Sequence, residues 1–368
     1  FIQPQRNDLV LATHGRSVWV LDDLTPFEQY TPDIGRAPLH LFPVPAAYRA
    51  AQWSEVEALG DGAFYGDNTP FGAMLTYTLA DSAATPGKLV ITDASGKVVR
   101  TMDGMRELAP TESAPDETVP TGEANPPLPK PDTVKHGGEA PWVPVNAGMH
   151  RIYWDLRADG PVRWRGTKDF NKGPMSGALV PPGTYTAALT VNGHTESQKI
   201  QVLADPRSHA TPADFQAEYA FASAQLDQMS QLDAVLNRLD AMRAQANALA
   251  EVVKGGPNAA AFASARAKLD AAMDSVVAGI TSNPQAIEST VRYPDMIREH
   301  LQILIGGIEG GDQAPTPAQV DQKALLDPEF RAAKARFDAF TQDDLRKFNA
   351  AMANLGLTGI ATGLVIVP

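Results

Sequence analysis

The chain has 368 residues, of which 43% are hydrophobic and 20% charged, and its net charge is −12. A single core seldom grows beyond about 250–300 residues, so this length predicts two or three domains. An acidic chain lacks the basic face that neutralises phosphates or anionic lipids, so we expect neither a nucleic acid nor a membrane as partner. The absence of cysteine excludes disulfides, thiol catalysis and cysteine metal sites.

The N-terminal residues predict a β-hairpin. Residues 8–23 form two alternating runs around a turn at His14 and Gly15. One hairpin cannot bury its apolar face alone, so it packs on the next domain or belongs to a larger sheet. The chain begins with Phe1 directly before this strand, and we read it as a piece of a longer protein whose missing signal peptide says nothing about export. Four polar residues gather here and are interpreted as turn and strand-end residues: His14, Arg16, Asp22 and Asp23.

Residues 24–50 read as a proline-rich connector with a short strand near 39–42, and residues 73–79 as a strand. The intervening turn cluster contains Asp61 and Asp67, but too few oxygen ligands for a calcium loop, so we interpret it as structural. Residues 88–102 predict a second hairpin. Residues 103–145 are rich in Pro, Glu, Thr and Gly, which predicts a long exposed insertion anchored near Trp142.

Two alternating runs, 150–156 and 185–191, are each bounded by turn residues, and they predict a central pair of strands with one face buried. A further strand over 198–203 completes the predicted sandwich. The loop between the paired strands is locally basic and aromatic. Within it, Arg163, Trp164 and Arg165 are the candidate ligand-binding residues, because an indole between two guanidinium groups can stack on a sugar or hold an acidic partner. The alternative is that Trp164 tucks against a neighbouring domain.

After residue 210 the apolar period changes from 2 to 3.6. Thr211 and Pro212 predict the start of a long helix that ends near Lys254. Further helices are predicted over 259–280 and 294–308, and a fourth after Pro328 that ends before Gly356, with a candidate break near Thr341. A β-prone tail follows at 364–367. Such helices predict an antiparallel bundle, through which a second copy of the chain could also associate.

A carboxylate metal site in a bundle needs inward Glu and Glu-x-x-His positions, but the inward positions here are apolar. His300 is the one helical histidine, and we interpret it as a core or surface residue. We therefore expect no metal and no cofactor. The sequence contains neither a GxSxG nor an HExxH motif, and no catalytic residue is assigned.

The predicted fold is of the α+β class and has several domains. A propeller-terminal hairpin and connector take residues 1–45, an antiparallel immunoglobulin-like β-sandwich takes 46–207 with the insertion at 103–145, and a four-helix bundle with a short β tail takes 208–368.

Several stretches resemble a known group of proteins. DLVLATHGRSVWVLDDLTP resembles the last propeller strands of bacterial exported proteins with BNR (Asp-box) repeats, which are sortilin-like or glycosyl-hydrolase-like. LVITDASGKVVR, AGMHRIYWDLR and LVPPGTYTAALTVNG resemble the FlgD-type immunoglobulin-like module, and LRKFNAAMANLGL is similar to the helical ends of those proteins. The resemblance covers nearly the whole chain as the C-terminal portion of a longer parent.

The resemblance implies a periplasmic or secreted parent that binds or hydrolyses polysaccharide, with two carboxylates across a propeller cleft. The chain contains no Asp-box, so no catalytic residue carries over. We therefore expect a non-catalytic accessory or scaffold region whose partner is its own propeller. The alternatives are a carbohydrate- or protein-binding module that uses the Trp164 loop, and a glycoside hydrolase whose active site lies in the propeller.

Overall fold

A computed structural model describes residues 1–15, 18–50, 69–107, 139–166, 175–282, 294–308 and 311–363. The chain is a mixed α+β protein that divides into two compact units. The β unit comprises Phe1–Arg157 and Pro182–Ser208, and the helical unit comprises Ala158–Pro181 and His209–Pro368. The described residues 158–166 and 175–181, which lie between predicted strands, therefore pack with the helices.

The N-terminal residues form a small antiparallel sheet, which confirms the hairpin predicted over 8–23. Its strands, in the order β1-β2-β3, are β1 (Ile2–Gln3), β2 (Asp8–Ala12) and β3 (Val18–Leu21). The connector then contains two short helices, α1 (Thr25–Gln29) and α2 (Pro32–Arg36), and a short strand, β4 (His40–Leu41).

Two larger sheets carry most of the β unit. The first has the order β11-β6-β4, with β6 at Ala73–Leu79 and β11 at Gly148–Trp154. The second has the order β5-β13-β12-β7-β8, and in it β5 runs parallel to β13 while the other neighbours are antiparallel. Its strands are β5 (Ala47–Arg49), β7 (Lys88–Thr92), β8 (Val98–Asp103), β12 (Gly183–Val191) and β13 (His194–Ala204).

The predicted pairing of the two central strands is wrong. β11 pairs with β6, from Gly148 opposite Leu79 to Trp154 opposite Ala73, whereas β12 pairs with β13 and β7. The two strands meet through side chains instead, because the Trp154 and Tyr185 rings make an edge contact with centroids 5.2 Å apart. Alternation reveals that a strand has a buried face, but it does not reveal its hydrogen-bonding partner.

The second hairpin is confirmed as β7 and β8. Its turn is held by Asp93, whose Oδ1 accepts hydrogen bonds from the Ser95 hydroxyl at 2.6 Å, the Ser95 amide at 2.9 Å and the Lys97 amide at 3.0 Å. These bonds, that from the Ser95 hydroxyl above all, lower the pKa of the Asp93 carboxyl. Gly96 adopts a positive φ of 85°, as a tight turn requires.

The insertion and the turn cluster lie largely outside the described residues, which omit 51–68 and 108–138 and therefore Asp61 and Asp67. At the ends of the insertion, β9 (Met105–Glu107) pairs with β10 (Glu139–Pro141). Trp142, the predicted anchor, donates its backbone N–H to the Gly104 carbonyl at 3.1 Å and lies under the Arg100 guanidinium.

The long first helix of the helical unit begins where the sequence predicts. Thr211 caps α4 by accepting a hydrogen bond from the Asp214 amide, and the Asp214 carboxylate bonds back to the Thr211 amide. The described helices are α4 (Pro212–Val253), α5 (Ala259–Val277), α6 (Ile297–Ile308), α7 (Pro317–Gln342) and α8 (Asp344–Asn354).

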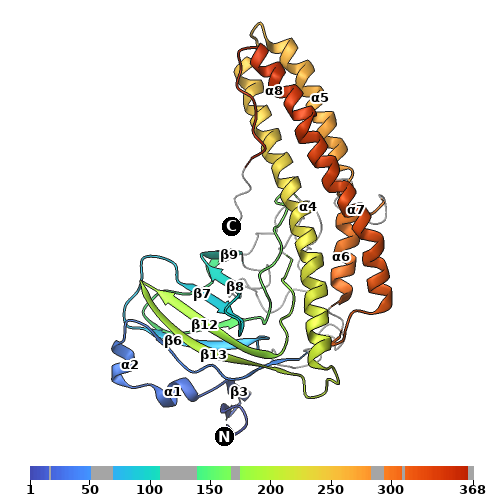
Figure 1. Ribbon diagram of the computed structural model, residues 1–368. Coiled ribbons are helices and arrows are strands. Elements are labelled where there is room, and N and C mark those ends of the chain that lie inside the picture. The colour runs from blue at the N-terminus through green and yellow to red at the C-terminus, as the bar shows by residue number, and fades with distance from the viewer. Residues whose placement is uncertain are drawn as a thin grey trace. The chain divides into compact units, whose positions relative to one another are not determined.

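The other helices of this unit are arranged along α4, which is the longest of them. α5 lies beside the C-terminal half of α4 and α8 packs on α5, whereas α6 and α7 lie beside the N-terminal half of α4 (Figure 1). The described part of the helical unit thus has five helices where the sequence predicts four. The difference arises because the predicted fourth helix consists of two helices, α7 and α8, which meet at Asp343, close to the predicted break near Thr341. In addition, α7 begins earlier than predicted, at Pro317 behind a Thr316–Gln319 capping box, and continues through Pro328.

The core of the helical unit forms where the predicted apolar stripe of α4 packs against the other helices. Its buried members recur every three or four residues and include Met229, Leu232, Leu236, Leu239 and Met242. No helix among the described residues is long and apolar enough to cross a bilayer.

Candidate ligand-binding cleft and the Trp164 loop

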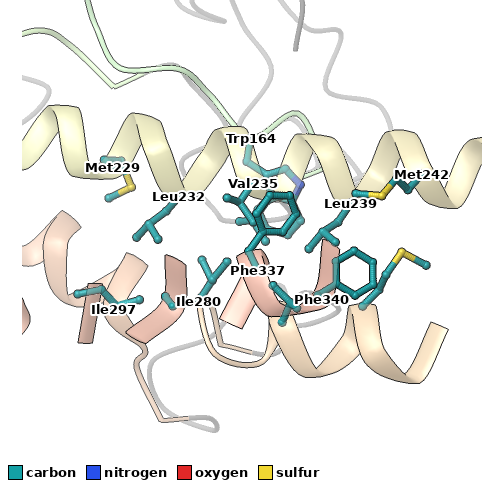
Figure 2. Packing of buried hydrophobic residues seen from close by; sticks show 14 of the residues in the cluster. Trp164, Met229, Leu232, Val235, Leu239, Met242, Ile280, Ile297, Phe337 and Phe340 are labelled. Atoms are coloured by element: carbon teal, nitrogen blue, oxygen red, sulfur yellow. The ribbon is translucent and has the colours of Figure 1, made fainter. Parts of the chain in front are cut away.

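The Trp164 loop (residues 158–166) carries the three candidate binding residues. The Trp164 side chain is 5% exposed and belongs to the core of the helical unit. Figure 2 shows its ring among core side chains of α4 such as Val235 and Leu239. Arg165 is exposed and Arg163 is half-buried. The structure thus brings the three residues to α4, with the indole ring turned inward.

A row of polar side chains on α4 holds this loop. Ser230 Oγ accepts the Val162 amide at 3.1 Å, and Asp233 Oδ2 accepts the Trp164 amide at 2.9 Å. Further along, Asn237 bonds both the Arg165 amide and the Arg163 carbonyl, and Asp240 accepts the indole N–H at 2.6 Å. Spacings of three and four residues place these side chains on one stripe, so the helix presents a matched series of partners to an extended backbone.

A buried ion pair lies beneath the loop. The Arg298 guanidinium of α6 donates to Asp233 Oδ1 at 2.7 Å, and both side chains are about 5% exposed or less. The same guanidinium lies over the Trp164 ring, 5.6 Å from its centroid. The indole N–H and the ring face are therefore already engaged within the helical unit. Trp164 can stack on a sugar only if the loop leaves α4.

A cleft in the β unit is the better candidate for a site. It encloses about 310 Å³. Its walls come from the turn between β1 and β2, the segment after β3, strand β5 with the residues before it, and the facing residues of β6 and β11. The residues that line these walls include Arg6, Asp8, Asp22, Asp23, Tyr48, Thr69, Gly72, Met74 and Tyr153.

Two of the three aspartates in the cleft wall hold its corner together. Asp8 Oδ1 accepts the Asp23 amide at 2.9 Å, and Asp23 Oδ1 accepts the Thr25 amide at 3.0 Å. Asp23 is buried in the left-handed conformation with φ of 49°, and its carbonyl accepts a hydrogen bond from Arg151. These contacts fix the passage from β3 into α1, which is the turn role predicted for Asp23.

Asp22 and Tyr153 offer polar groups to the cleft. Asp22 Oδ1 accepts the Thr69 hydroxyl at 3.2 Å. The Tyr153 hydroxyl contacts the Met74 sulfur at 3.4 Å, a weak acceptor. Burial above all raises the pKa of the Tyr153 hydroxyl; the charge of Arg151 opposes this effect and that of Asp22 adds to it. The phenol is therefore a protonated donor at neutral pH.

The polar group predicted around the first hairpin does not assemble. His14 is exposed in the turn, Arg16 lies outside the described residues, and Asp22 and Asp23 stand at the far ends of the strands. Sequence reasoning did not find the cleft, because Tyr48 and Tyr153 come from strands distant in the chain. The one available signal was the adjacent pair of aspartates at the end of the hairpin.

Among the described residues, no group of three histidine or acidic side chains is placed to hold a metal ion. His300 is partly exposed on α6, with Nδ1 3.8 Å from a Glu329 carboxylate oxygen. Comparison of the chain with protein-family models, curated proteins and solved structures finds no match.

Proposed function

We propose that this chain is a non-catalytic accessory region of an exported protein, periplasmic or secreted, whose propeller binds or hydrolyses polysaccharide. The proposal rests on one observation, the N-terminal sheet β1-β2-β3, which is apolar and exposed on both faces. The partner is the propeller of the same protein.

The strand register defines the two faces of this sheet. Leu11 lies opposite Trp19 and Leu9 opposite Leu21, so one face carries a cross-strand apolar row. Val10 lies opposite Val20 and Ala12 opposite Val18 on the other face. All four residues of β3 are exposed, with Trp19 63% and Val20 56% exposed.

An exposed apolar surface of this kind is typical of an interface. Antiparallel sheets usually pack one face and leave a polar face in water. A sheet that is apolar on both sides fits between two other sheets, which is the position of a blade within a propeller. Among the described strands, β3 also lies at the edge of this sheet, a position to which a further strand can add.

The finer fold forms part of the same proposal. We interpret the two large sheets as an immunoglobulin-like sandwich, supported by the Trp154–Tyr185 contact between them and by the β7–β8 hairpin. We interpret the helices as a bundle that braces the parent protein. A second copy of the chain is a further partner of this bundle, since Ile303 and Leu325 are exposed apolar residues on α6 and α7.

The test is binding between this chain and the separately purified propeller of its parent protein, measured by isothermal titration calorimetry. Leu11→Lys and Val20→Lys each place a charge on one face of the sheet. Each is expected to weaken the complex at least tenfold, because a buried unpaired charge is costly. Val98→Lys is the matched control, since Val98 is a 51% exposed strand valine outside this sheet. Binding that none of the three variants alters would overturn the proposal, as would glycan hydrolysis by this chain alone.

The alternative function is a carbohydrate- or protein-binding module. The cleft in the β unit supports this alternative, whereas the Trp164 loop does not. The other alternative is a glycoside hydrolase whose active site lies in the propeller. In that case the whole protein hydrolyses the polysaccharide, and substitution of the cleft residues of this chain leaves the rate of hydrolysis unchanged.

A further inference from the structure

The cleft in the β unit has the dimensions of a small binding site. Its volume of about 310 Å³ lies at the lower end of the range of about 300–1,000 Å³ that is usual for ligand pockets. The walls combine apolar and polar groups, and the residues come from separate strands and turns of one compact unit. The described site can therefore enclose a single ring better than an extended chain.

The polar groups of the wall divide into two sets. Asp8 and Asp23 each accept a backbone N–H that fixes the corner between β3 and α1. Asp22 accepts only the Thr69 hydroxyl among the described residues, and Tyr153 donates only to a sulfur atom. The cleft thus offers a carboxylate acceptor and a protonated phenol donor whose hydrogen-bonding capacity is not exhausted.

Tyr48 supplies an exposed aromatic surface beside these groups. It lies in the middle of β5, where its neighbours Ala47 and Arg49 are buried and Tyr48 is 46% exposed. Strand alternation therefore directs the Tyr48 side chain away from the interior of the unit and into the cleft wall. A phenol ring in this position presents a flat apolar face with a polar tip.

The charge of the wall limits the ligand. Three aspartates and one arginine line the cleft, so a phosphate, sulfate or carboxylate group would meet a net negative surface. The acidic side chains do not converge into a metal site within the described part of the chain. An uncharged ligand with several hydroxyl groups meets both the acceptor and the donor, and its apolar face matches Tyr48.

We propose that this cleft binds one uncharged sugar ring, which stacks on Tyr48 and hydrogen-bonds to Asp22 and Tyr153. This inference deepens the proposed function, on which it rests for the presence of polysaccharide near the chain, and it assigns the contact to the β unit. Gly72 lies in the same wall, and its lack of a side chain lets the backbone approach closely there.

The test is saturation-transfer NMR and calorimetric titration of the chain with glucose, galactose, mannose and xylose and their short oligomers, with glucuronate and glucosamine as charged counterparts. At least one neutral sugar is expected to bind at least tenfold more tightly than glucuronate, which the net negative wall repels. Tyr48→Ala is expected to weaken this binding at least tenfold, and Asp22→Asn and Tyr153→Phe several-fold each. Tyr30→Ala is the matched control, because Tyr30 is 47% exposed and lies outside the cleft.

Circular dichroism of each variant shows whether it has kept its fold, and Tyr153→Phe, which removes a single oxygen, gives a readout even where Tyr48→Ala unfolds. Absence of binding by every neutral sugar would overturn the inference. So would binding that Tyr48→Ala leaves intact, or a preference for glucosamine that Asp22→Asn removes. Propeller binding through Leu11 and Val20 is measured separately, so the failure of one proposal is distinguishable from the failure of the other.

Discussion

The ion pair between Arg298 and Asp233 is the contact in the helical unit whose loss has the clearest cost. Arg298→Ala leaves the Asp233 carboxylate buried without its cation, which typically destabilises a protein by about 3–5 kcal/mol. We expect a loss of this size in urea unfolding followed by circular dichroism at 222 nm. Arg243→Ala is the control, because its partner Asp274 is exposed, its second partner Asp270 is partly exposed, and such pairs contribute about 0–1 kcal/mol. Equal losses in the two variants would contradict the assignment.

The pKa of the Asp205 carboxyl is a measure of the contacts in the turn that follows β13. Its carboxylate accepts hydrogen bonds from the Arg207 side chain, with the shortest N–O distance 2.6 Å, and these bonds lower the pKa of Asp205 to about 2. The unfolded value is about 3.9, so this contact stabilises the fold above pH 4, and the stabilisation is lost as the pH falls towards 2.

In Arg207→Gln, the pKa of the Asp205 carboxyl is expected to rise towards the unfolded value, as measured by NMR titration of its side-chain carbon. Asp93 serves as an internal control in the same spectra, because its pKa is lowered chiefly by Ser95. An Asp205 titration midpoint that stays near 2 in the variant would show that Arg207 is not the cause.

At the level of single residues, the sequence predicted which side chains are unusual better than it predicted what they do. A tryptophan between two arginines is a reasonable binding motif, yet Trp164 is buried against α4. The side chains that hold it there belong to a helix some 70 residues later, and only folding brings them together. Tyr48 carried no local signal, because an isolated tyrosine in a proline-rich segment looks like an ordinary connector residue.

At the level of elements, the sequence-based prediction and the structure differ on the residue at which α7 begins. The structure begins this helix at Pro317, where the Thr316 hydroxyl accepts the Gln319 amide and the Gln319 side chain bonds back. Thr316→Ala should therefore cost about 0.5–2 kcal/mol in urea unfolding, as is usual for the loss of an N-cap. Thr341→Ala removes a hydroxyl near the other end of the same helix and is expected to change stability by less than about 0.5 kcal/mol. A helix that began after Pro328 would make Thr316→Ala equally neutral.

The attachment of the Trp164 loop to α4 is testable by hydrogen exchange. Asn237 accepts the Arg165 amide and donates to the Arg163 carbonyl, so Asn237→Ala should speed exchange of the Arg165 amide more than that of Val162, which bonds to Ser230. Gln231→Ala is the control, since among the described residues Gln231 hydrogen-bonds to Asp227 and Lys334 and to no atom of this loop. Unchanged exchange at Arg165 would show that the loop is held by packing alone.

Periodicity predicted most elements of both units, because side-chain burial repeats every two residues in strands and every three or four in helices. It placed strand β6 and the capped start of α4 directly. It could not predict that β11 and β12 join different sheets, since both have the same alternating pattern whichever strand they pair with. Periodicity also could not predict that α7 contains Pro328, because proline normally indicates a helix boundary.

At the level of the whole molecule, two cores of different construction share one chain. The chain passes between the units three times, at residues 157–158, 181–182 and 208–209. Each unit has its own buried set, built around Trp154, Tyr77 and Leu189 in the sheets and around the α4 stripe in the helices. Units with separate cores can unfold as separate cooperative transitions.

A variant in each core tests this division. Gly72 has φ of 125°, and a Cβ there would stand 2.0 Å from the Trp154 carbonyl oxygen, so Gly72→Ala strains the β unit by about 1–3 kcal/mol. Near-ultraviolet circular dichroism reports mainly on the β unit, which holds Trp19, Trp142 and Trp154, whereas Trp164 is the one described tryptophan of the helical unit. The signal at 222 nm follows the helices. Gly72→Ala should lower the first transition and leave the second in place, whereas Arg298→Ala should do the reverse. If either variant lowers both transitions equally, the chain unfolds as one cooperative body, and the two cores depend on each other for stability.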